Sequence, residues 1–266
     1  MLTNYHTHTT YCDGKNTPEE IVLRAIEEGF DAIGFSGHGY TSFDESYCMK
    51  DISAYISDIG GLKEKYKGKI QIYLGYEEDA FAPSNREDFD YIIGSSHYFY
   101  IDGKYCPIDS NYEYFHKCLS AFDGDIIKLA DSYYSSFCDY IIKRKPDIVG
   151  HFDLITKFDE MDSGLFLENN DYLKLSEKYM ERAISGGAIF EVNTGAIARG
   201  LRTTPYPYEN LLYVLKKHNA KIILSSDSHS KDTLDCNFEQ TRKLLYDVGF
   251  RYVYMLYDNE FQKDYL

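Results

Sequence analysis

The chain has 266 residues, with 28 Lys and Arg against 43 Asp and Glu, which gives a formal net charge of −15. This length allows one large hydrophobic core, and a hydrophobic content of 44% is ordinary for a globular protein, so a disordered chain and a disulfide-stapled miniature are excluded. The acidic balance argues against a sequence-independent nucleic-acid binder and against an anionic membrane surface as partner, because both require a basic face.

The chain begins without the basic and apolar segments of an export signal, and it contains no apolar run of about 18 residues. We therefore expect a cytoplasmic protein with no membrane span. The six cysteines are widely spaced, with no C-x-x-C pair, which favours reduced thiols. No segment resembles a linker or a repeat, so we expect a single domain over residues 1–266. No obligate protein partner is evident from the sequence.

Short runs of β-forming residues recur along the chain, and each leads into a loop and then a helical pattern. The predicted strands are residues 2–5, 32–35, 70–74, 91–93, 148–149, 188–192 and 222–224, with a possible late strand at 252–256. This alternation is typical of parallel strands joined by crossover helices. The expected fold class is therefore α/β.

The helical stretches carry start and stop signals. Thr17-Pro18-Glu19-Glu20 combines an N-cap, a proline at the first helical position and a capping-box glutamate, and Gly29 ends that helix. Apolar spacing predicts further helices at 51–66, 112–122 and 126–144, after residue 208 and before residue 249. The long connection at about 101–145 is predicted to be a helical insertion that shapes a substrate pocket.

Most of the eight histidines, and two acidic residues, follow closely on the ends of predicted strands. They are His6, His8, His38, His97, His151 and His229, with Glu77 and Asp227. Since the carboxyl ends of parallel strands form one face of an α/β barrel, the topology predicts that these side chains meet. Buried carboxylates and imidazoles are costly unless cations lie between them, so the cluster favours a divalent metal site.

Each position also has an ordinary interpretation. A single histidine is more often a surface or core residue than a metal ligand. Asp13 could be the first residue of an Asp-Gly turn, and Glu78 and Asp79 are equally available alternatives to Glu77. The metal interpretation depends on the joint pattern.

Seven short motifs hold these residues in order along the chain. They are His6-Thr7-His8, Asp13-Gly14, Ser36-Gly37-His38, Gly75-Tyr76-Glu77, Ser96-His97, Gly150-His151-Phe152-Asp153 and Ser226-Asp227-Ser228-His229. Together they resemble the polymerase and histidinol phosphatase (PHP) family, from residue 4 to about residue 230. Segments 145–155 and 191–195, with Arg199-Gly200, more narrowly resemble the monofunctional histidinol-phosphate phosphatases.

The resemblance implies a distorted (β/α)7 TIM-like barrel, the PHP fold, with a centre of three divalent metal ions. It implies one ion on His6, His8, Glu77 and Asp227, a second on His97 and His151 bridged by Glu77, and a third on Asp13, His38 and His229. Many relatives have a histidine where this chain has Asp13, so zinc, manganese and iron all stay open, with zinc favoured.

The cluster predicts metal-assisted hydrolysis of a phosphate monoester, because no nucleophilic Ser or Cys motif accompanies it. The resemblance implies a histidinol-phosphatase of histidine biosynthesis, in which metal-activated hydroxide cleaves L-histidinol phosphate to L-histidinol and phosphate. The expected catalytic residues are Glu77, Asp227 and Arg199. The expected substrate-binding residues are Arg199, Arg202, Lys157 and Asp153. Arg202 and Lys157 have the alternative of being solvated surface charges.

Other functions fit the same metal centre. A relative acting on another small phosphate monoester, on nucleotides or on nucleic acid is one, although the acidic balance counts against a nucleic-acid substrate. A phosphotyrosine phosphatase is another. A metal-stabilised binding module that has lost catalysis is a third, but every ligand position is filled.

Overall fold

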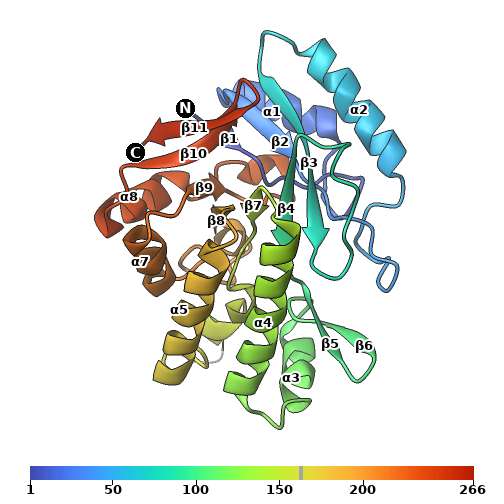
Figure 1. Ribbon diagram of the computed structural model, residues 1–266. Helices are drawn as coiled ribbons and strands as arrows, with labels where there is room; N and C mark the ends of the chain where they lie inside the picture. The colour runs from blue at the N-terminus through green and yellow to red at the C-terminus, as the bar shows by residue number, and fades with distance from the viewer. Residues whose placement is uncertain (162–163) are drawn as a thin grey trace.

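The structure is a computed structural model that describes residues 1–161 and 164–266. Its main feature is a nine-stranded sheet, in the order β1-β2-β3-β4-β7-β8-β9-β10-β11, that curls into a half barrel (Figure 1). The strands are β1 (Thr3–Asn4), β2 (Ala32–Phe35), β3 (Gln71–Asp79), β4 (Tyr91–Ser95), β7 (Ile148–Val149), β8 (Ile189–Asn193), β9 (Ile222–Ser225), β10 (Tyr252–Tyr257) and β11 (Glu260–Tyr265).

Neighbouring strands from β1 to β10 pair in parallel, and β11 pairs antiparallel with β10. The predicted α/β class is therefore confirmed. All seven expected strands are present, and the late strand β10 adds an eighth parallel one. A TIM-like barrel is consistent with this sheet, whereas the count of seven βα units is not confirmed.

The sheet approaches closure where the segments after β1 and β9 meet. The His8 N–H donates to the Ser228 carbonyl at 2.8 Å, and the Ser228 N–H donates to the His6 carbonyl at 3.0 Å. The Asn4 amide also donates to the Ser226 hydroxyl at 2.8 Å. Two distant parts of the chain, both histidine-bearing, are thereby held side by side.

Helices cover the outside of the curled sheet, with α4 and α5 side by side (Figure 1). The helices are α1 (Pro18–Glu27), α2 (Ile52–Lys65), α3 (Tyr112–Ser120), α4 (Ile126–Arg144), α5 (Asn170–Ile184), α6 (Gly195–Ala198), α7 (Glu209–Lys217) and α8 (Phe238–Val248), with short 3-10 turns at Leu154–Thr156, Asp159–Met161 and Lys231–Thr233. The capping box at Thr17 is confirmed. None of the helices described is long and apolar enough to cross a membrane.

Both faces of the parallel strands from β2 to β9 are buried, as parallel sheets require, whereas the edge strand β11 is exposed. Along β2, Ala32 packs with Tyr5 in an inner cluster, whereas Ile33 packs in a second cluster with α1 and α2 residues. The largest cluster contains the aromatic face of α4, including Tyr134 and Phe137, both fully buried. All six cysteines are free thiols, as predicted.

Several strands and helices were not predicted from the sequence. The antiparallel strands β5 (Tyr98–Ile101) and β6 (Lys104–Pro107) form a hairpin, so the first residues of the expected helical insertion at about 101–145 are not helical. The turn residues Asp102 and Gly103 have positive φ values of 50° and 80°, and Asp-Gly is a favoured hairpin turn. Helices α5 and α6 and strand β11 were also not predicted.

Candidate metal centre

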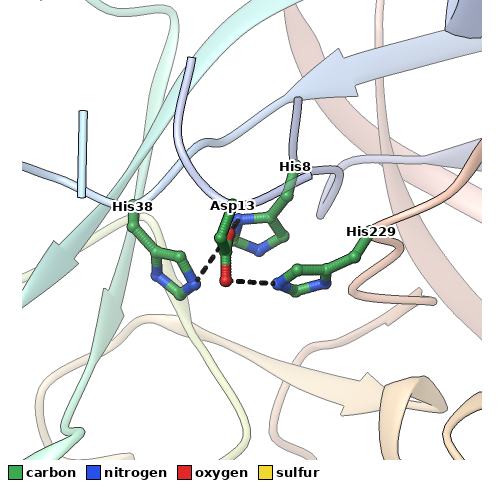
Figure 2. A group of neighbouring side chains, drawn as sticks. All are labelled: His8, Asp13, His38 and His229. Atoms are coloured by element: carbon green, nitrogen blue, oxygen red, sulfur yellow. Dashed lines mark ion pairs between the residues drawn. The ribbon is translucent and has the colours of Figure 1, made fainter. Parts of the chain in front are cut away.

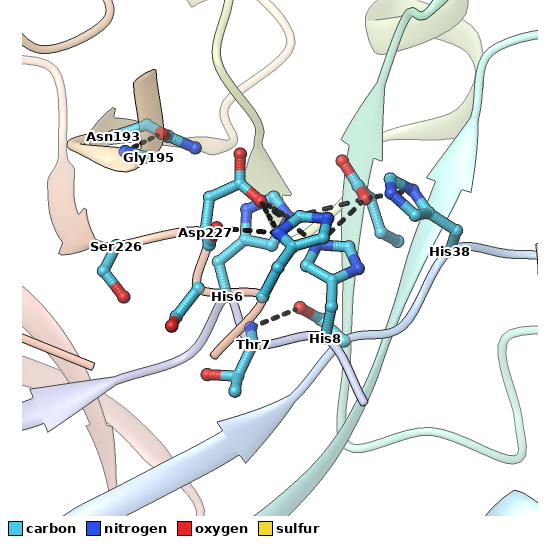
Figure 3. Close-up of polar contacts among 12 residues, drawn as sticks. His6, Thr7, His8, His38, Asn193, Gly195, Ser226 and Asp227 are labelled. Atoms are coloured by element: carbon cyan, nitrogen blue, oxygen red, sulfur yellow. Dashed lines mark hydrogen bonds and ion pairs between the residues drawn. The ribbon is translucent and has the colours of Figure 1, made fainter. Parts of the chain in front are cut away.

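The nine side chains expected to bind metal lie together near the carboxyl ends of the strands. Figures 2 and 3 label His6, His8, Asp13, His38, Asp227 and His229 of this set. The nine side chains form four overlapping groups, which are His6–Glu77–His151, His6–His8–Asp227, His38–Glu77–His97 and His8–Asp13–His38–His229. Within each group the candidate ligand atoms all lie within 4.8 Å of one another. Because neighbouring groups share residues, the nine side chains form one continuous cluster.

Glu77 joins the two halves of this cluster. Its Oε2 lies 2.7 Å from His38 Nδ1 and 3.4 Å from His6 Nε2. Its Oε1 lies 3.0 Å from His151 Nε2 and 3.4 Å from His97 Nε2. A carboxylate with imidazoles at both oxygens has the arrangement that a bridging ligand needs.

Strand β3 is longer than predicted, and this places Glu77. The strand runs to Asp79 rather than ending near Leu74, so Glu77 lies within it and not after it. The reason is tertiary, since β3 pairs with β2 through Leu74 and with β4 from Gly75 onward. The Ser95 hydroxyl of β4 donates to Glu77 Oε1 at 2.7 Å and fixes the carboxylate.

Asp13 lies at the mouth of the cluster between two imidazoles (Figure 2). Its Oδ2 is 3.3 Å from His229 Nε2, and its Oδ1 is 3.6 Å from His38 Nε2. Asp13 also occupies a turn, because the Gly14 N–H donates to the Thr9 carbonyl at 3.0 Å. The turn presents the carboxylate to the histidines, so the two interpretations of Asp13 are compatible.

Backbone geometry brings Asp227 close to its neighbours. Asp227 has a φ of 48°, an uncommon conformation for a residue with a side chain that is found at functional sites. A Cβ at Gly195 would lie 2.9 Å from both Asp227 Cβ and Arg199 Nη2. A glycine at position 195 therefore leaves the space that the Asp227 side chain and the Arg199 guanidinium occupy at the start of α6.

Two carboxylates outside the predicted set hold the imidazoles from behind. Glu191 Oε1 lies 2.7 Å from His6 Nδ1, and Asp79 Oδ2 lies 3.1 Å from His97 Nδ1. From the sequence, Asp79 was only an alternative to Glu77, and Glu191 was only part of the matched segment 191–195. The signal for Glu191 was an acidic residue inside the otherwise apolar run of β8.

Several buried polar atoms point at one another without hydrogen bonds. His6 Nε2, His8 Nε2 and Glu77 Oε2 have no hydrogen-bond partner among the described residues. A buried polar atom left unpaired costs about 1–3 kcal/mol, so three converging ones need a common partner. Imidazole nitrogens and carboxylate oxygens are the donors that zinc, manganese and iron accept. The side chains present therefore fit divalent cations.

The electrostatics keep Glu77 ionised and His8 neutral, the forms of these two groups that bind metal. Burial opposes ionisation of Glu77, but His6, His38 and His97 outweigh it and hold the pKa of Glu77 well below its usual value. Burial, together with His229 and His38, lowers the pKa of His8 to about 3. His8 is thus a neutral imidazole at pH 7, which is the form that binds metal.

A cavity of about 460 Å³ opens onto the cluster. Five of the expected metal ligands, His38, His97, His151, Asp227 and His229, line it together with a sixth, Asp13. Tyr98 of β5, Pro107 of β6 and Asp109 just beyond it also line the cavity. The start of the predicted insertion therefore lines the cavity.

Of the four expected substrate-binding residues, Arg199 and Lys157 line this cavity. Arg199 Nη2 donates to Asp227 Oδ2 at 3.1 Å, and the Arg199 side chain is 33% exposed. Lys157 Nζ donates to the Asp109 carbonyl at 2.7 Å and to its Oδ2 at 3.1 Å. Neither is a freely solvated charge, since the Lys157 side chain is only 13% exposed.

Arg202 and Asp153 are not among the residues that line the cavity. The Arg202 guanidinium is stacked between the rings of Tyr206, at 4.0 Å, and Tyr208, at 3.7 Å. Asp153 is fully buried and accepts a hydrogen bond from the Tyr208 N–H at 2.9 Å. The alternative of a solvated surface charge is wrong for Arg202, which is 3% exposed.

Comparisons with known proteins identify relatives of this chain and solved structures with a similar fold. The chain is 26% identical to a Schizosaccharomyces pombe protein named "Probable histidinol-phosphatase", over 96% of this chain and 90% of the other. It is also 26% identical to the histidinol-phosphatase of Bacillus subtilis, over 88% and 96%. The histidinol phosphate phosphatase of Lactococcus lactis, crystallised with zinc, L-histidinol and phosphate, shares the fold with a TM-score of 0.68 at 21% identity, over 98% and 99%. The model of the PHP domain matches residues 4–195, so the chain belongs to the PHP domain family.

Proposed function

We propose that this protein is a metal-dependent histidinol-phosphatase that hydrolyses L-histidinol phosphate to L-histidinol and phosphate. The observation that carries the proposal is the convergence of His6 Nε2, His8 Nε2 and Glu77 Oε2, three buried atoms without hydrogen bonds, next to side chains that line a cavity with Arg199. The relatives described above, named histidinol-phosphatases and similar over nearly their whole length, support the choice of substrate.

We assign three divalent cations to the nine side chains. His6, His8, Glu77 and Asp227 hold the first; His97 and His151, with Glu77 bridging, hold the second; and Asp13, His38 and His229 hold the third. Nine donors in four overlapping groups exceed what one ion can use, which supports more than one cation. The histidine-rich donor set and the zinc in the Lactococcus structure favour zinc over manganese or iron.

Divalent cations, when bound, lower the pKa of water toward neutrality and offset the charge of a phosphoryl group. The chain's own contribution is to position and to exclude solvent. His6, His8 and Glu77 are buried, so the reacting phosphorus would lie at the edge of a dry cluster. In such a setting, fixed charges act more strongly than in water.

Arg199 is the residue we assign to the phosphate oxygens. Its guanidinium already lies against Asp227 and within 3.3 Å of His229 Nδ1, so it adjoins the cation ligands and faces the cavity. A planar guanidinium can donate to two phosphate oxygens at once. Lys157 supplies a second cation on the same cavity, held by Asp109.

Arg202 and Asp153 are assigned a supporting role in the same proposal. Burial raises the pKa of Asp153, although the Arg202 charge opposes this. Their stacking and hydrogen bonds fix Tyr206 and Tyr208 next to the segment that carries Arg199. A cytoplasmic location, a single domain and the lack of an obligate partner stay predictions.

The test is a substrate panel on purified, cation-loaded protein. Histidinol phosphate, a dinucleotide and a phosphotyrosine peptide are compared by kcat/KM, with a chelator-treated sample as control. We expect a strong preference for histidinol phosphate and loss of turnover after chelation. A preference for either other substrate, or full activity in cation-free protein, would overturn the proposal.

A further inference from the structure

Glu191 is a buried carboxylate that the proposed reaction does not use directly. It lies in the middle of β8 and is 1% exposed. It does not line the cavity, and it belongs to none of the four candidate metal groups. A buried carboxylate is costly unless donors surround it, so its contacts indicate its role.

Each oxygen of Glu191 is occupied by a different part of the cluster. Oε1 accepts from His6 Nδ1 at 2.7 Å. Oε2 accepts from the His151 backbone N–H at 2.9 Å and from the Asn193 side-chain amide at 2.9 Å. One side chain therefore ties the segment after β1 to the residue after β7.

The contact to His6 fixes which ring nitrogen faces the cluster. A carboxylate can only accept, so a proton lies on Nδ1, and Nε2 is the ring nitrogen that faces Glu77 at 3.4 Å and Asp227 at 3.7 Å. A carboxylate behind an imidazole also makes the other nitrogen a stronger ligand. His8 lacks a carboxylate at hydrogen-bond distance from its Nδ1, which lies 3.5 Å from Cys12 Sγ and 3.7 Å from Asp13 Oδ1.

We propose that Glu191 is the positioning residue of the metal centre: it sets the tautomer of His6 and the backbone at His151 together, so that ligands from two strands present one preformed site. The inference rests on the proposed function for the identity of the metal ligands. It extends that function by naming a residue that controls cation affinity without touching the substrate.

The test is Glu191→Gln, read by Zn²⁺ titration of cation-free protein against a competing chelator. Glutamine keeps the size but has a single acceptor oxygen for three donors, so at least one contact is lost. We expect about 10- to 100-fold weaker binding of at least one zinc equivalent. The matched control, Glu78→Gln, changes an equally buried carboxylate on the outer face of the sheet, and zinc affinity should stay at the wild-type value.

A cycle with His6→Ala separates positioning from general damage. If Glu191 acts through His6, Glu191→Gln should weaken zinc binding less in the His6→Ala background than in the wild type. Equal weakening in both backgrounds, or wild-type affinity in Glu191→Gln, would overturn the proposal. If Glu191→Gln does not fold, Glu191→Asp replaces it, since a carboxylate one methylene shorter is also drawn away from His6 and should weaken zinc binding.

These readouts do not depend on the substrate. A wild-type protein that binds zinc but ignores histidinol phosphate would overturn the proposed function and leave the role of Glu191 intact. Conversely, full zinc affinity in Glu191→Gln would show that Glu191 is not a positioning residue, and the proposed hydrolysis of histidinol phosphate would be unaffected.

Discussion

The inner and outer faces of β3 carry two adjacent glutamates with opposite surroundings. Glu77 and Glu78 are both buried, at 1% and 0% exposure. Glu77 faces imidazoles on both of its oxygens, and its Oε2 lacks a hydrogen bond. Glu78 accepts from Arg144 Nε at 2.9 Å and Nη2 at 2.7 Å, and from the Tyr140 hydroxyl at 2.8 Å.

The difference shows that burial of a carboxylate does not by itself indicate function. Glu78 has a complete set of donors, including the Ser84 N–H and hydroxyl, and it fastens α4 to the sheet. Around Glu77, the imidazole nitrogens and carboxylate oxygens outnumber the hydrogen bonds that they form with one another. An excess of ligands is the feature that calls for cations, whereas a complete set of donors is the feature of a structural ion pair.

The largest expected effect is on the inner face. Glu77→Gln should lower kcat/KM for histidinol phosphate by about 10³-fold or more, equivalent to about 4 kcal/mol, because a neutral amide cannot bridge two cations. Elemental analysis should show loss of at least one bound cation. Wild-type kcat/KM together with full cation content would contradict the assignment of Glu77.

On the outer face of β3, we expect a substitution to lower the stability of the protein rather than its activity. Arg144→Met leaves the Glu78 carboxylate buried without its cation, and we expect a loss of about 3 kcal/mol in the free energy of unfolding, measured by urea denaturation. The kcat/KM of the folded protein should stay close to wild type. Unchanged stability would show that the ion pair between Arg144 and Glu78 does not stabilise the fold.

Arg199 tests whether an exposed cation beside the inner cluster acts on substrate. Arg199→Ala should reduce kcat/KM by about 30- to 100-fold, about 2–3 kcal/mol, because a guanidinium contact to phosphate is lost. Arg242→Ala is the matched control, since Arg242 pairs with Asp264 and does not line the cavity. Kinetics unchanged by Arg199→Ala would remove Arg199 from the site.

The smallest effect concerns Asp109, which lines the cavity and forms an ion pair with Lys157, much as Glu78 does with Arg144. Burial opposes its ionisation, yet Lys157 outweighs this and lowers the pKa of Asp109 to about 2. A folded-state pKa below the unfolded value adds stability above about pH 4, and this stability is lost as the pH falls toward 2.

The full contribution is about 2 kcal/mol. We therefore expect the difference in unfolding free energy between wild type and Asp109→Asn to be larger at pH 6 than at pH 3. Comparing the two proteins at each pH cancels effects that are common to both. A constant difference between them across this range would show that Lys157 does not stabilise the Asp109 carboxylate.

Local sequence signals were sufficient where short-range physics decides the structure. The capping box at Thr17 and the alternation of β-forming runs with helical patterns gave the strands and most helices. They failed for both hairpins, whose turns Asp102-Gly103 and Asp258-Asn259 have positive φ at both residues. Asp-Gly was a readable signal, whereas Asp-Asn is a weaker one.

For the site, the sequence determined which residue types gather at the strand ends, because imidazole and carboxylate chemistry restricts the candidates and parallel topology collects them on one face. Their roles as ligands stay predictions. The residues alone left Glu77 and Glu78 as alternatives, and Glu77 was chosen by the family resemblance. Only the tertiary structure decided that Arg202 is stacked and buried and that Glu191 lies behind His6. Register and side-chain contacts between distant strands determine these features, and no local pattern encodes them.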